Sequence, residues 1–231
     1  MNHSLSLIQK SDQLEAAVRE LTQPINGQYP RPWMTSLTSP ASAGLFIVGK
    51  NQRNSFDIGA VGSHADYLDA LFNRGSETCR QLYDRLTDKP SPTRRHTDDL
   101  VAMLGRNGVT EVLETNVICY STPMSADLQK SLNAGGASRG REIFETLFRL
   151  IKPRVIIAHG RDTAKELGRV LGCILPKPPE KPGDPVKVIA GGTTVFVIPS
   201  LAPPAYNQWS SWSAEHLEQV CRQAADAMQG P

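Results

Sequence analysis

The sequence predicts an α/β protein: a three-layer α/β/α sandwich on a mostly parallel sheet of about four strands. Two observations support this fold class. Short apolar runs alternate along the chain with segments of helical periodicity, as in repeated strand–helix units. The first of these runs, 45–48, contains no polar residue, which is typical of a strand buried on both faces of a parallel sheet. The 231 residues, 39% of them apolar, are enough for one such domain over 1–231.

Residues 1–43 are expected to be an N-terminal extension packed on this domain. Apolar residues at helical spacing predict an amphipathic helix over 11–22, with Ser11 as its N-cap. Residues 23–40 contain four prolines and predict an irregular segment on the surface. We interpret Trp33 in this segment as a packing anchor rather than a platform for a ligand, because buried aromatic rings usually belong to cores.

The first strand is the apolar run 45–48, which is expected to end at Gly49. Five polar residues follow it at once: Lys50, Asn51, Gln52, Arg53 and Asn54. Ligands of open α/β sheets bind outside the carboxyl ends of the strands, so these side chains are expected where a ligand would lie. An ordinary polar loop between a strand and a helix is the alternative interpretation.

Two helices are expected over 63–87, because Gly75 interrupts an otherwise helical periodicity. The prolines of 89–96 are taken to exclude regular structure there, and Thr93 is expected to cap a helix that runs to about residue 104. Three side chains that can carry positive charge then lie near the start of that helix: Arg94, Arg95 and His96. Since the helix dipole disfavours cations at this end, they indicate a nearby anion or, alternatively, a solvated turn.

Three more strands of the sheet are expected: 109–117, 154–158 and 193–198. The last of them is expected to form a hairpin with 186–190. Helical periodicity marks the segments between and after them: 142–151, 163–171 and 213–228. Asn116 near the end of one strand, His159 after the next and Ser200 after the last are expected at the same sheet edge as Asn51. In the alternative interpretation, Asn116 satisfies its own backbone in a turn and His159 is structural.

Composition and spacing limit the classes of function. The formal net charge of +2 neither requires nor excludes a nucleic-acid partner. The four cysteines form no CxxC pair, so we expect reduced, mostly buried thiols and no metal or iron–sulfur cluster. No charged start precedes an apolar stretch and no window approaches about 18 apolar residues, so we expect no signal peptide and no membrane span. A cytoplasmic monomer without a cofactor is the expectation.

Short motifs at the expected strand ends resemble those of the uracil-DNA glycosylase superfamily. Gly49–Arg53 is similar to its first motif, in which a strand ends in Gly, any residue, and then Asp or Asn. Val197–Ser200 is similar to its second motif, usually His-Pro-Ser. Further similar segments are the strand whose Asn reads uracil (Thr115–Val117), a strand ending in Gly (Ala158–Gly160) and a proline-rich loop (Lys89–Thr93). The resemblance spans about residues 31–225, in the same order.

The resemblance implies a DNA glycosylase of base excision repair. Such an enzyme flips uracil out of DNA and hydrolyses its N-glycosidic bond, leaving an abasic site. Asn51 is then expected to hold the attacking water and Asn116 to read the O4 and N3 edge of the base. Phe56 is expected to stack on the base, with Tyr67 as second choice and core packing as the alternative for both. The implied catalytic residues are Asn51, Gln52 and Ser200, and the implied base-binding residues are Asn116, Phe56, Gly49, Arg53 and His159.

DNA containing uracil is the implied partner, and its backbone requires cations and hydroxyl groups. The implied DNA contacts are Ser91, Arg94, Arg95, Pro199, Leu201 and Tyr206, with Arg53, Arg139 and Ser200 as further phosphate ligands. Leu201 or Tyr206 is expected to enter the duplex and fill the gap left by the flipped nucleotide. The resemblance implies no metal.

Two departures from the family pattern leave alternatives open. Gln52 stands where Pro is usual, and Ile198 stands where a His normally donates a hydrogen bond to a base oxygen. Loss of such a donor typically lowers a rate by about 10²–10³. The candidate replacements are Tyr206, Asn207, Gln208 and Arg53. The competing functions are a protein on the same fold that binds damaged bases or nucleotides without cleaving them, and a hydrolase of small nucleosides or nucleotides.

Overall fold

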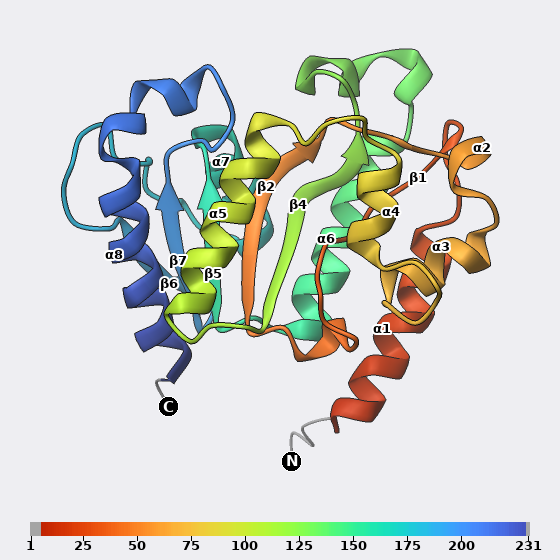
Figure 1. The fold of residues 1–231 in the computed structure, drawn as a ribbon, viewed down its shortest axis with the longest axis horizontal. Coiled ribbons are helices and arrows are strands. Elements are labelled where there is room, and N and C mark those ends of the chain that lie inside the picture. The colour runs from red at the N-terminus through yellow and green to blue at the C-terminus, as the bar shows by residue number, and fades with distance from the viewer. Residues whose placement is uncertain (1–5, 230–231) are drawn as a thin grey trace. The chain divides into compact units, whose positions relative to one another are not determined.

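The computed structural model describes residues 6–229, which form an α/β structure (Figure 1). As the sequence predicts, a mostly parallel sheet is flanked by helices in a three-layer α/β/α sandwich. The strand order is β4-β2-β5-β7-β6. The strands are β2 (Leu45–Gln52), β4 (Val112–Ser121), β5 (Val155–His159), β6 (Lys187–Ala190) and β7 (Thr193–Ile198). The sheet has five strands rather than about four, because β6 joins its edge antiparallel to β7.

The described residues divide into two compact units. Unit 1 comprises 6–43, 51–88 and 113–152, and unit 2 comprises 44–50, 89–112 and 153–229. Strand β2 is shared: its residues through Lys50 belong to unit 2, and Asn51 and Gln52 belong to unit 1. The single domain with an N-terminal extension stays a prediction.

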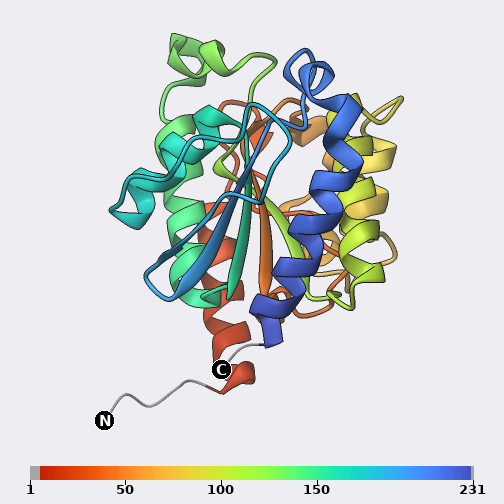
Figure 2. The ribbon, with the colours of Figure 1, turned by 90° about the vertical axis from the view of Figure 1, so that its left-hand side faces the viewer.

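Unit 2 is built around β5, which is the parallel neighbour of both β2 and β7. Figure 2 shows α5 (Pro92–Arg106) and α8 (Ser210–Gln229) on one face of these strands and α7 (Arg161–Leu171) on the other. Apolar residues of α5, α8 and the strands form one buried cluster. The apolar run that predicts β5 is therefore buried on both faces, as expected of a central parallel strand.

Helix α5 begins at Pro92, and its N-cap is Ser91, whose Oγ accepts a hydrogen bond from the backbone N–H of Arg94 at 3.1 Å. The predictions that the prolines exclude regular structure here and that Thr93 caps the helix are wrong. Proline is well tolerated at the first helical position, because its missing N–H would have no partner within the helix. Arg94 and Arg95 therefore lie in the first turn of α5.

Unit 1 contains five α-helices within its described residues: α1 (Leu7–Leu21), α2 (Ile58–Val61), α3 (His64–Leu71), α4 (Cys79–Arg85) and α6 (Gly136–Ile151). Helix α1 begins before the expected Ser11, because Ser6 caps it through reciprocal hydrogen bonds with Gln9 of 3.1 and 3.2 Å. The break expected at Gly75 is confirmed, since this residue lies between α3 and α4.

Residues 23–40 are largely irregular, but much of the segment is buried rather than on the surface. Trp33 is 1% exposed and its Nε1 donates to the Leu71 carbonyl at 2.9 Å, which confirms it as a packing anchor. A small antiparallel sheet that the sequence did not predict pairs β1 (Gln28–Tyr29) with β3 (Phe56–Asp57). The described chain also contains short 3₁₀ helices: η1 (Pro40–Ser42), η2 (Ser125–Gln129), η3 (Ser131–Asn133) and η4 (Ala205–Gln208).

Strands β2 and β4 extend beyond their expected ends. The first strand does not stop at Gly49 but continues through three polar residues to Gln52. The strand expected over 109–117 begins later and runs to Ser121. Polar side chains do not prevent backbone pairing, so they mark where the apolar surface ends rather than where the strand ends. Asn116 is consequently inside β4 and not near its end.

The thiols are mostly buried, as expected. Cys79, Cys119 and Cys221 are buried, Cys173 is exposed, and all four are unpaired. Within residues 6–229, no helix combines the length and apolar character needed to cross a bilayer. The same residues contain no group of three or more His, Cys, Asp or Glu placed to hold a metal ion.

Candidate functional site

Asn51, near the end of β2 in unit 1, has a side chain fixed by hydrogen bonds at both ends. Its Nδ2 donates to Thr122 Oγ1 at 3.0 Å and to the Gln52 carbonyl at 3.2 Å. Its Oδ1 accepts a hydrogen bond from Ser125 Oγ at 2.7 Å. Thr122 Oγ1 donates in turn to the Met124 carbonyl at 2.9 Å, so the direction of every bond in this Asn51 relay is determined.

The relay prepares the Asn51 carbonyl oxygen to bind water. This oxygen has two lone pairs, and the hydroxyl of Ser125 uses only one of them. The Ser125 hydroxyl keeps its own capacity to accept, so one water molecule can donate a hydrogen to each oxygen. An amide is too weak a base to deprotonate water at neutral pH. The group can therefore orient a water molecule without ionising it.

Asn116 lies inside β4, between two residues whose side chains come close together. Thr115 Oγ1 and Cys119 Sγ are 3.5 Å apart, and both donate to the Pro32 carbonyl, at 2.6 and 3.6 Å. Residues four apart in a straight strand are separated by about 13 Å, so the chain between them must bend. Such irregularities re-aim side chains. The half-buried Asn116 amide makes no hydrogen bond with another residue of 6–229, which leaves it available to a ligand.

Two other expected site residues of unit 1, one for base binding and one for catalysis, are packed in its core. Phe56 has no exposed surface: the Arg31 guanidinium lies over its ring at 4.8 Å, and Tyr67, equally buried, meets it edge-on at 6.1 Å between centroids. Gln52 is 4% exposed and its Nε2 donates to the Arg31 carbonyl at 2.7 Å. Both side chains therefore have packing roles. For Phe56, this is the alternative to base stacking that the sequence analysis left open. Arg53 is exposed, which suits a phosphate contact better than a base contact.

In unit 2, His159 ends β5 beside Ile198 of β7, and Gly49 follows Val48, which is the partner of Ala158 in the β2–β5 register. Ile198 is fully buried in the apolar core, whereas His159 is half-buried. Burial lowers the pKa of His159 to about 4, and its Nδ1 is buried without a hydrogen-bond partner. The imidazole is therefore neutral at pH 7. We place its proton on Nε2, because a proton on Nδ1 would have no acceptor.

The turn after β7 holds Ser200 by its backbone and side chain. Ser200 Oγ accepts a hydrogen bond from the Ala202 N–H at 3.1 Å, and its carbonyl accepts one from Trp209 Nε1 at 2.9 Å. Gly160 has a φ of +93°, and a Cβ there would lie 3.4 Å from the Ser200 Cβ, so glycine suits this close approach. Within residues 6–229 the hydroxyl hydrogen of Ser200 has no acceptor, which leaves it available to an anion, and the half-buried Pro199 precedes it.

The cations at the start of α5 differ in their availability. Arg94 is 8% exposed and forms an ion pair with Asp98 at 2.8 Å. A buried and paired guanidinium is poorly placed to contact the DNA backbone, and the expected phosphate contact of Arg94 stays a prediction. Arg95 is exposed and keeps its expected role. Ser91 serves as the helix cap, so its hydroxyl oxygen already accepts a hydrogen bond.

The two residues expected to enter a duplex are held within unit 2. Leu201 has no exposed surface, and its carbonyl accepts a hydrogen bond from His96 Nδ1 at 2.8 Å. Its expected insertion into DNA stays a prediction, and it would require the side chain first to leave the apolar core. Tyr206 is half-buried, with its ring stacked on His96 at 3.5 Å and its hydroxyl bonded to Ser213 at 3.0 Å.

Sequence reasoning missed the residues that support Asn51. Thr122 and Ser125 lie in an unremarkable polar stretch, and nothing local in the sequence distinguishes them. Their role depends on the backbone bond from the Thr122 N–H to the Gln52 carbonyl at 3.0 Å, which joins segments far apart in the chain. It also missed an ion pair of unit 2, Lys50 with Asp162 at 2.8 Å, which lowers the pKa of the Asp162 carboxyl.

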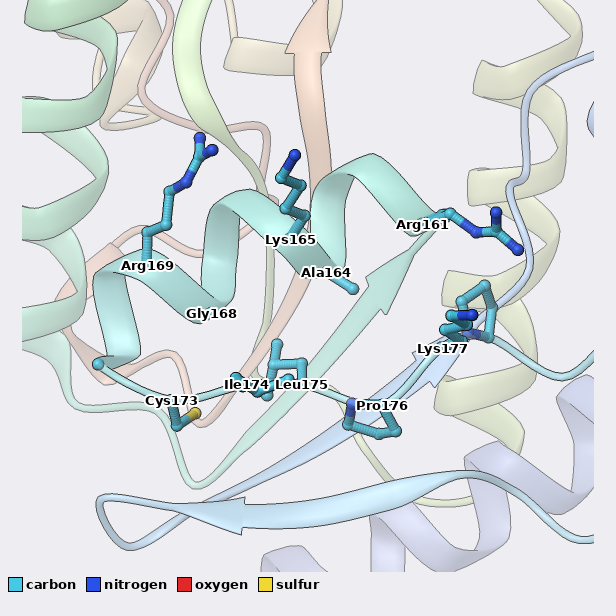
Figure 3. Close-up of a pocket in the computed structure, with 12 residues that line it drawn as sticks. Arg161, Ala164, Lys165, Gly168, Arg169, Cys173, Ile174, Leu175, Pro176 and Lys177 are labelled. Atoms are coloured by element: carbon cyan, nitrogen blue, oxygen red, sulfur yellow. The ribbon is translucent and has the colours of Figure 1, made fainter.

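A separate cavity of about 650 Å³ lies in unit 2, between α7 and the segment 172–178 (Figure 3). Cations from both sides line it, among them Lys165 and Lys177, together with the exposed Cys173. It contains none of the residues expected from the sequence to bind base or DNA. We therefore do not assign it to the chemistry of the strand ends.

No protein-family model matches the chain, and a search of curated proteins found no match either. The resemblance to the uracil-DNA glycosylase superfamily depends on the motifs of the sequence alone.

Proposed function

We propose that this protein removes uracil from DNA by hydrolysis of the N-glycosidic bond. The observation that carries this function is the Asn51 relay. It provides an amide oxygen near the carboxyl end of a sheet strand, fixed by Thr122 and Ser125 and ready to orient one water molecule. The order of the motifs along the chain supports the same reaction.

The reaction begins with heterolysis of the bond between C1′ and N1, and the electron pair leaves with the base. The sugar cation that forms is already a strong electrophile, so it requires a well-placed water rather than a strong base. Asn51 Oδ1 and Ser125 Oγ hold this water, its oxygen adds to C1′ and its proton passes to solvent. An asparagine can serve this order of events, whereas concerted attack by a deprotonated water would need a carboxylate or a histidine.

Asn116 selects uracil. Its amide accepts a hydrogen bond from N3–H and donates one to O4, whereas cytosine presents an acceptor at N3 and a donor at its exocyclic amine. A mismatched base leaves buried polar groups unpaired, at a cost of about 1–3 kcal/mol each. That corresponds to roughly 5- to 160-fold in rate or affinity. The unpartnered amide at the bend of β4 supports this role.

His159 supplies the hydrogen-bond donor that Ile198 lacks. Its neutral imidazole presents an Nε2–H, and it lies next to Ile198 in the strand register. A neutral donor can stabilise negative charge that develops on a base oxygen as the bond breaks. The half-buried Tyr206 is less suited to this role, because its hydroxyl already bonds Ser213.

Phosphate contacts come from the exposed Arg53 and Arg95 and from the hydroxyl of Ser200. We leave Phe56 and Tyr67 out of base stacking, because neither ring has exposed surface.

The test is incubation of the purified chain with oligonucleotides that carry one uracil, followed by alkaline cleavage at abasic sites. We expect release by the wild-type chain and none by Asn51→Ala, which should still bind the DNA. Asn54→Ala is the matched control, because Asn54 lies in the same segment outside the relay. Release by Asn51→Ala at the wild-type rate would exclude the proposed role of the relay.

One observation favours a second function, a protein that binds damaged DNA without cleaving it. The position that usually carries a catalytic histidine in the second motif is Ile198, fully buried in the core. The same experiment separates the two functions. Tight binding of uracil-containing DNA without any alkali-labile product, by the wild-type chain, would establish the binder and exclude the enzyme.

A further inference from the structure

The cavity of unit 2 between α7 and the segment 172–178 has the size of a small-molecule site (Figure 3). Its volume of about 650 Å³ lies within the range of about 300–1,000 Å³ that is typical of ligand pockets. None of the residues to which we assign a role in uracil release lines it. A ligand bound here would therefore be independent of the proposed function.

Gly168 of α7 determines how closely the facing segment approaches the helix. A Cβ at this position would lie 2.6 Å from the Cys173 carbonyl oxygen, so a larger residue would push the segment away. The Cys173 N–H donates to the Gly168 carbonyl at 3.0 Å. Farther along, the rings of Pro176 and Pro178 fix their own φ angles. The segment is thus held against α7 at its start and stiffened along its length, which keeps the cavity preformed.

The side chains that line the cavity are aliphatic or cationic, apart from the thiol of Cys173. The aliphatic wall includes Ala164, Leu175 and Ile174, and Ile174 is 97% exposed. Four lining residues carry positive charge, and none carries a carboxylate, a hydroxyl, an amide or an aromatic ring. A sugar or a nucleobase would find no side chain to stack on and few partners for its polar groups. A ligand with a hydrocarbon body and an anionic group fits this lining.

The positive charge is concentrated at one end of the cavity. Figure 3 shows Arg161 and Lys177 at the same end, whereas the cationic groups of Lys165 and Arg169 point away from the facing segment. Lys177 forms no ion pair with another described residue. Arg161 pairs with Glu180 at 3.2 Å, but both side chains are exposed, so the pair is weak and other N–H donors of the guanidinium stay free. An anionic group can therefore bind at this end.

The apolar part of the cavity extends along α7 from this cationic end. Helix α7 rises about 1.5 Å per residue, so Arg161 and Gly168 are about 10 Å apart along its axis, the length of an extended chain of about eight carbons. Both residues line the cavity. The dimensions therefore suit an unbranched chain of medium length.

We propose that this cavity binds a free medium-chain aliphatic carboxylate. The carboxylate lies between Arg161 and Lys177, where the guanidinium can donate two parallel hydrogen bonds and the ammonium group a third. The hydrocarbon chain runs along Ala164 and Leu175 and covers part of Ile174, which removes apolar surface from water. Charge complementarity thus selects the head group, and the aliphatic wall selects the body.

The first test is isothermal titration calorimetry of the full chain with octanoate. We expect saturable binding that weakens at higher salt, because the head group is ionic. Butyrate should bind at least about tenfold more weakly, since each methylene group removed from water contributes about fourfold in affinity. Octanol and octylammonium, which lack the negative charge, should also bind at least about tenfold more weakly. Equal affinity for octanoate and octanol, or no binding of octanoate, would overturn the proposal.

Two pairs of variants locate the bound octanoate. Ile174→Asp places a carboxylate on the aliphatic wall and should weaken binding at least about tenfold. Its matched control is Ile189→Asp, which changes an isoleucine that is 75% exposed on β6, outside the cavity. Lys177→Gln should weaken binding about five- to tenfold, whereas Lys181→Gln, in the loop that follows, should not. Circular dichroism verifies that each variant folds. Wild-type affinity in both Ile174→Asp and Lys177→Gln would overturn the proposal.

Two other anionic occupants are tested with the same variants. Vesicles of phosphatidylglycerol present anionic groups on a membrane surface, and a single-stranded oligonucleotide presents phosphates. Ile174→Asp and Ile189→Asp should bind each of them equally. Weaker binding by Ile174→Asp alone would assign the cavity to a membrane surface or to DNA and overturn the proposal. These outcomes can be read whether or not the chain releases uracil, because no residue of the Asn51 relay lines the cavity.

Discussion

Thr122 provides the sharpest test of the Asn51 relay, because a pair of substitutions separates its hydroxyl from its methyl group. Thr122→Val keeps the shape of the side chain and removes both hydrogen bonds of Oγ1, one with Asn51 and one with Met124. Thr122→Ser keeps the hydroxyl and removes only the buried methyl group. The residue is 2% exposed, so water cannot replace what is lost.

The size of the effect follows from the partners that remain. In Thr122→Val, Asn51 Nδ2 still donates a hydrogen bond to the Gln52 carbonyl, and the Met124 carbonyl still accepts one from the Asp127 N–H. The cost therefore lies at the low end of the range for a buried unpaired group, about 1 kcal/mol. That corresponds to a loss of roughly 2–4 °C in Tm for a chain of this size and to about fivefold in rate if Asn51 loosens by the same amount. Loss of the methyl group in Thr122→Ser costs about 0.8 kcal/mol.

The two variants should thus have similar thermal stability and different activity. Circular dichroism measures the two Tm values, and alkaline cleavage of a uracil oligonucleotide measures release at 25 °C, where both variants are folded. We expect Thr122→Val alone to slow release. Equal release by the two variants would show that the hydroxyl does not position Asn51. A Tm of Thr122→Val equal to that of wild type would show that the two hydrogen bonds contribute nothing.

Three further predictions concern DNA affinity, pH and packing. Arg95→Ala should reduce the slope of log affinity against log salt by about 0.9, measured by fluorescence anisotropy with duplex DNA, whereas Arg94→Ala should lower the Tm and leave the slope unchanged. The pKa of His159 is about 4 in the folded chain and about 6.5 in the unfolded chain, so the free energy of unfolding should decrease as the pH is lowered from 6.5 to 4. Urea titrations of His159→Gln should show a smaller decrease over this range. An unchanged decrease would contradict this reasoning. Gly140→Ala places a Cβ 2.8 Å from a backbone nitrogen of β4 and should lower the free energy of unfolding by about 1–3 kcal/mol. Gly105→Ala, with open space around its Cβ, should raise the free energy of unfolding by about 0.5–1 kcal/mol. The Tm values of the two variants measure these changes, and a Tm of Gly140→Ala equal to that of wild type would contradict the prediction.

The fold class could be predicted because central parallel strands leave a local signal. The uninterrupted apolar runs 45–48 and 155–158 are both buried strands of the sheet, and no knowledge of distant residues was needed to recognise them. The start of α5 could also have been predicted from the sequence. Ser91 followed by Pro92 is an N-cap followed by a favoured first helical residue, and the error was to treat proline only as a breaker.

The site was less accessible, because its features arise from segments far apart in the chain. The bend of β4 at Asn116 involves the carbonyl of Pro32, 83 residues before Thr115. The burial of Leu201 likewise depends on which helices cover it. A sequence pattern can show that such residues are polar or apolar, but which surface covers them is decided by tertiary packing.

The distribution of thiols has a practical consequence. Maleimides react with thiolates, and burial raises the pKa of Cys119 to about 11 and that of Cys221 to about 12, whereas Cys173 lies on the surface beside the cavity of unit 2. A fluorophore should therefore couple to the native chain at one position without any engineered substitution. Labelling of the buried cysteines would then require unfolding, so the rate at which further dye couples would measure the rate of unfolding.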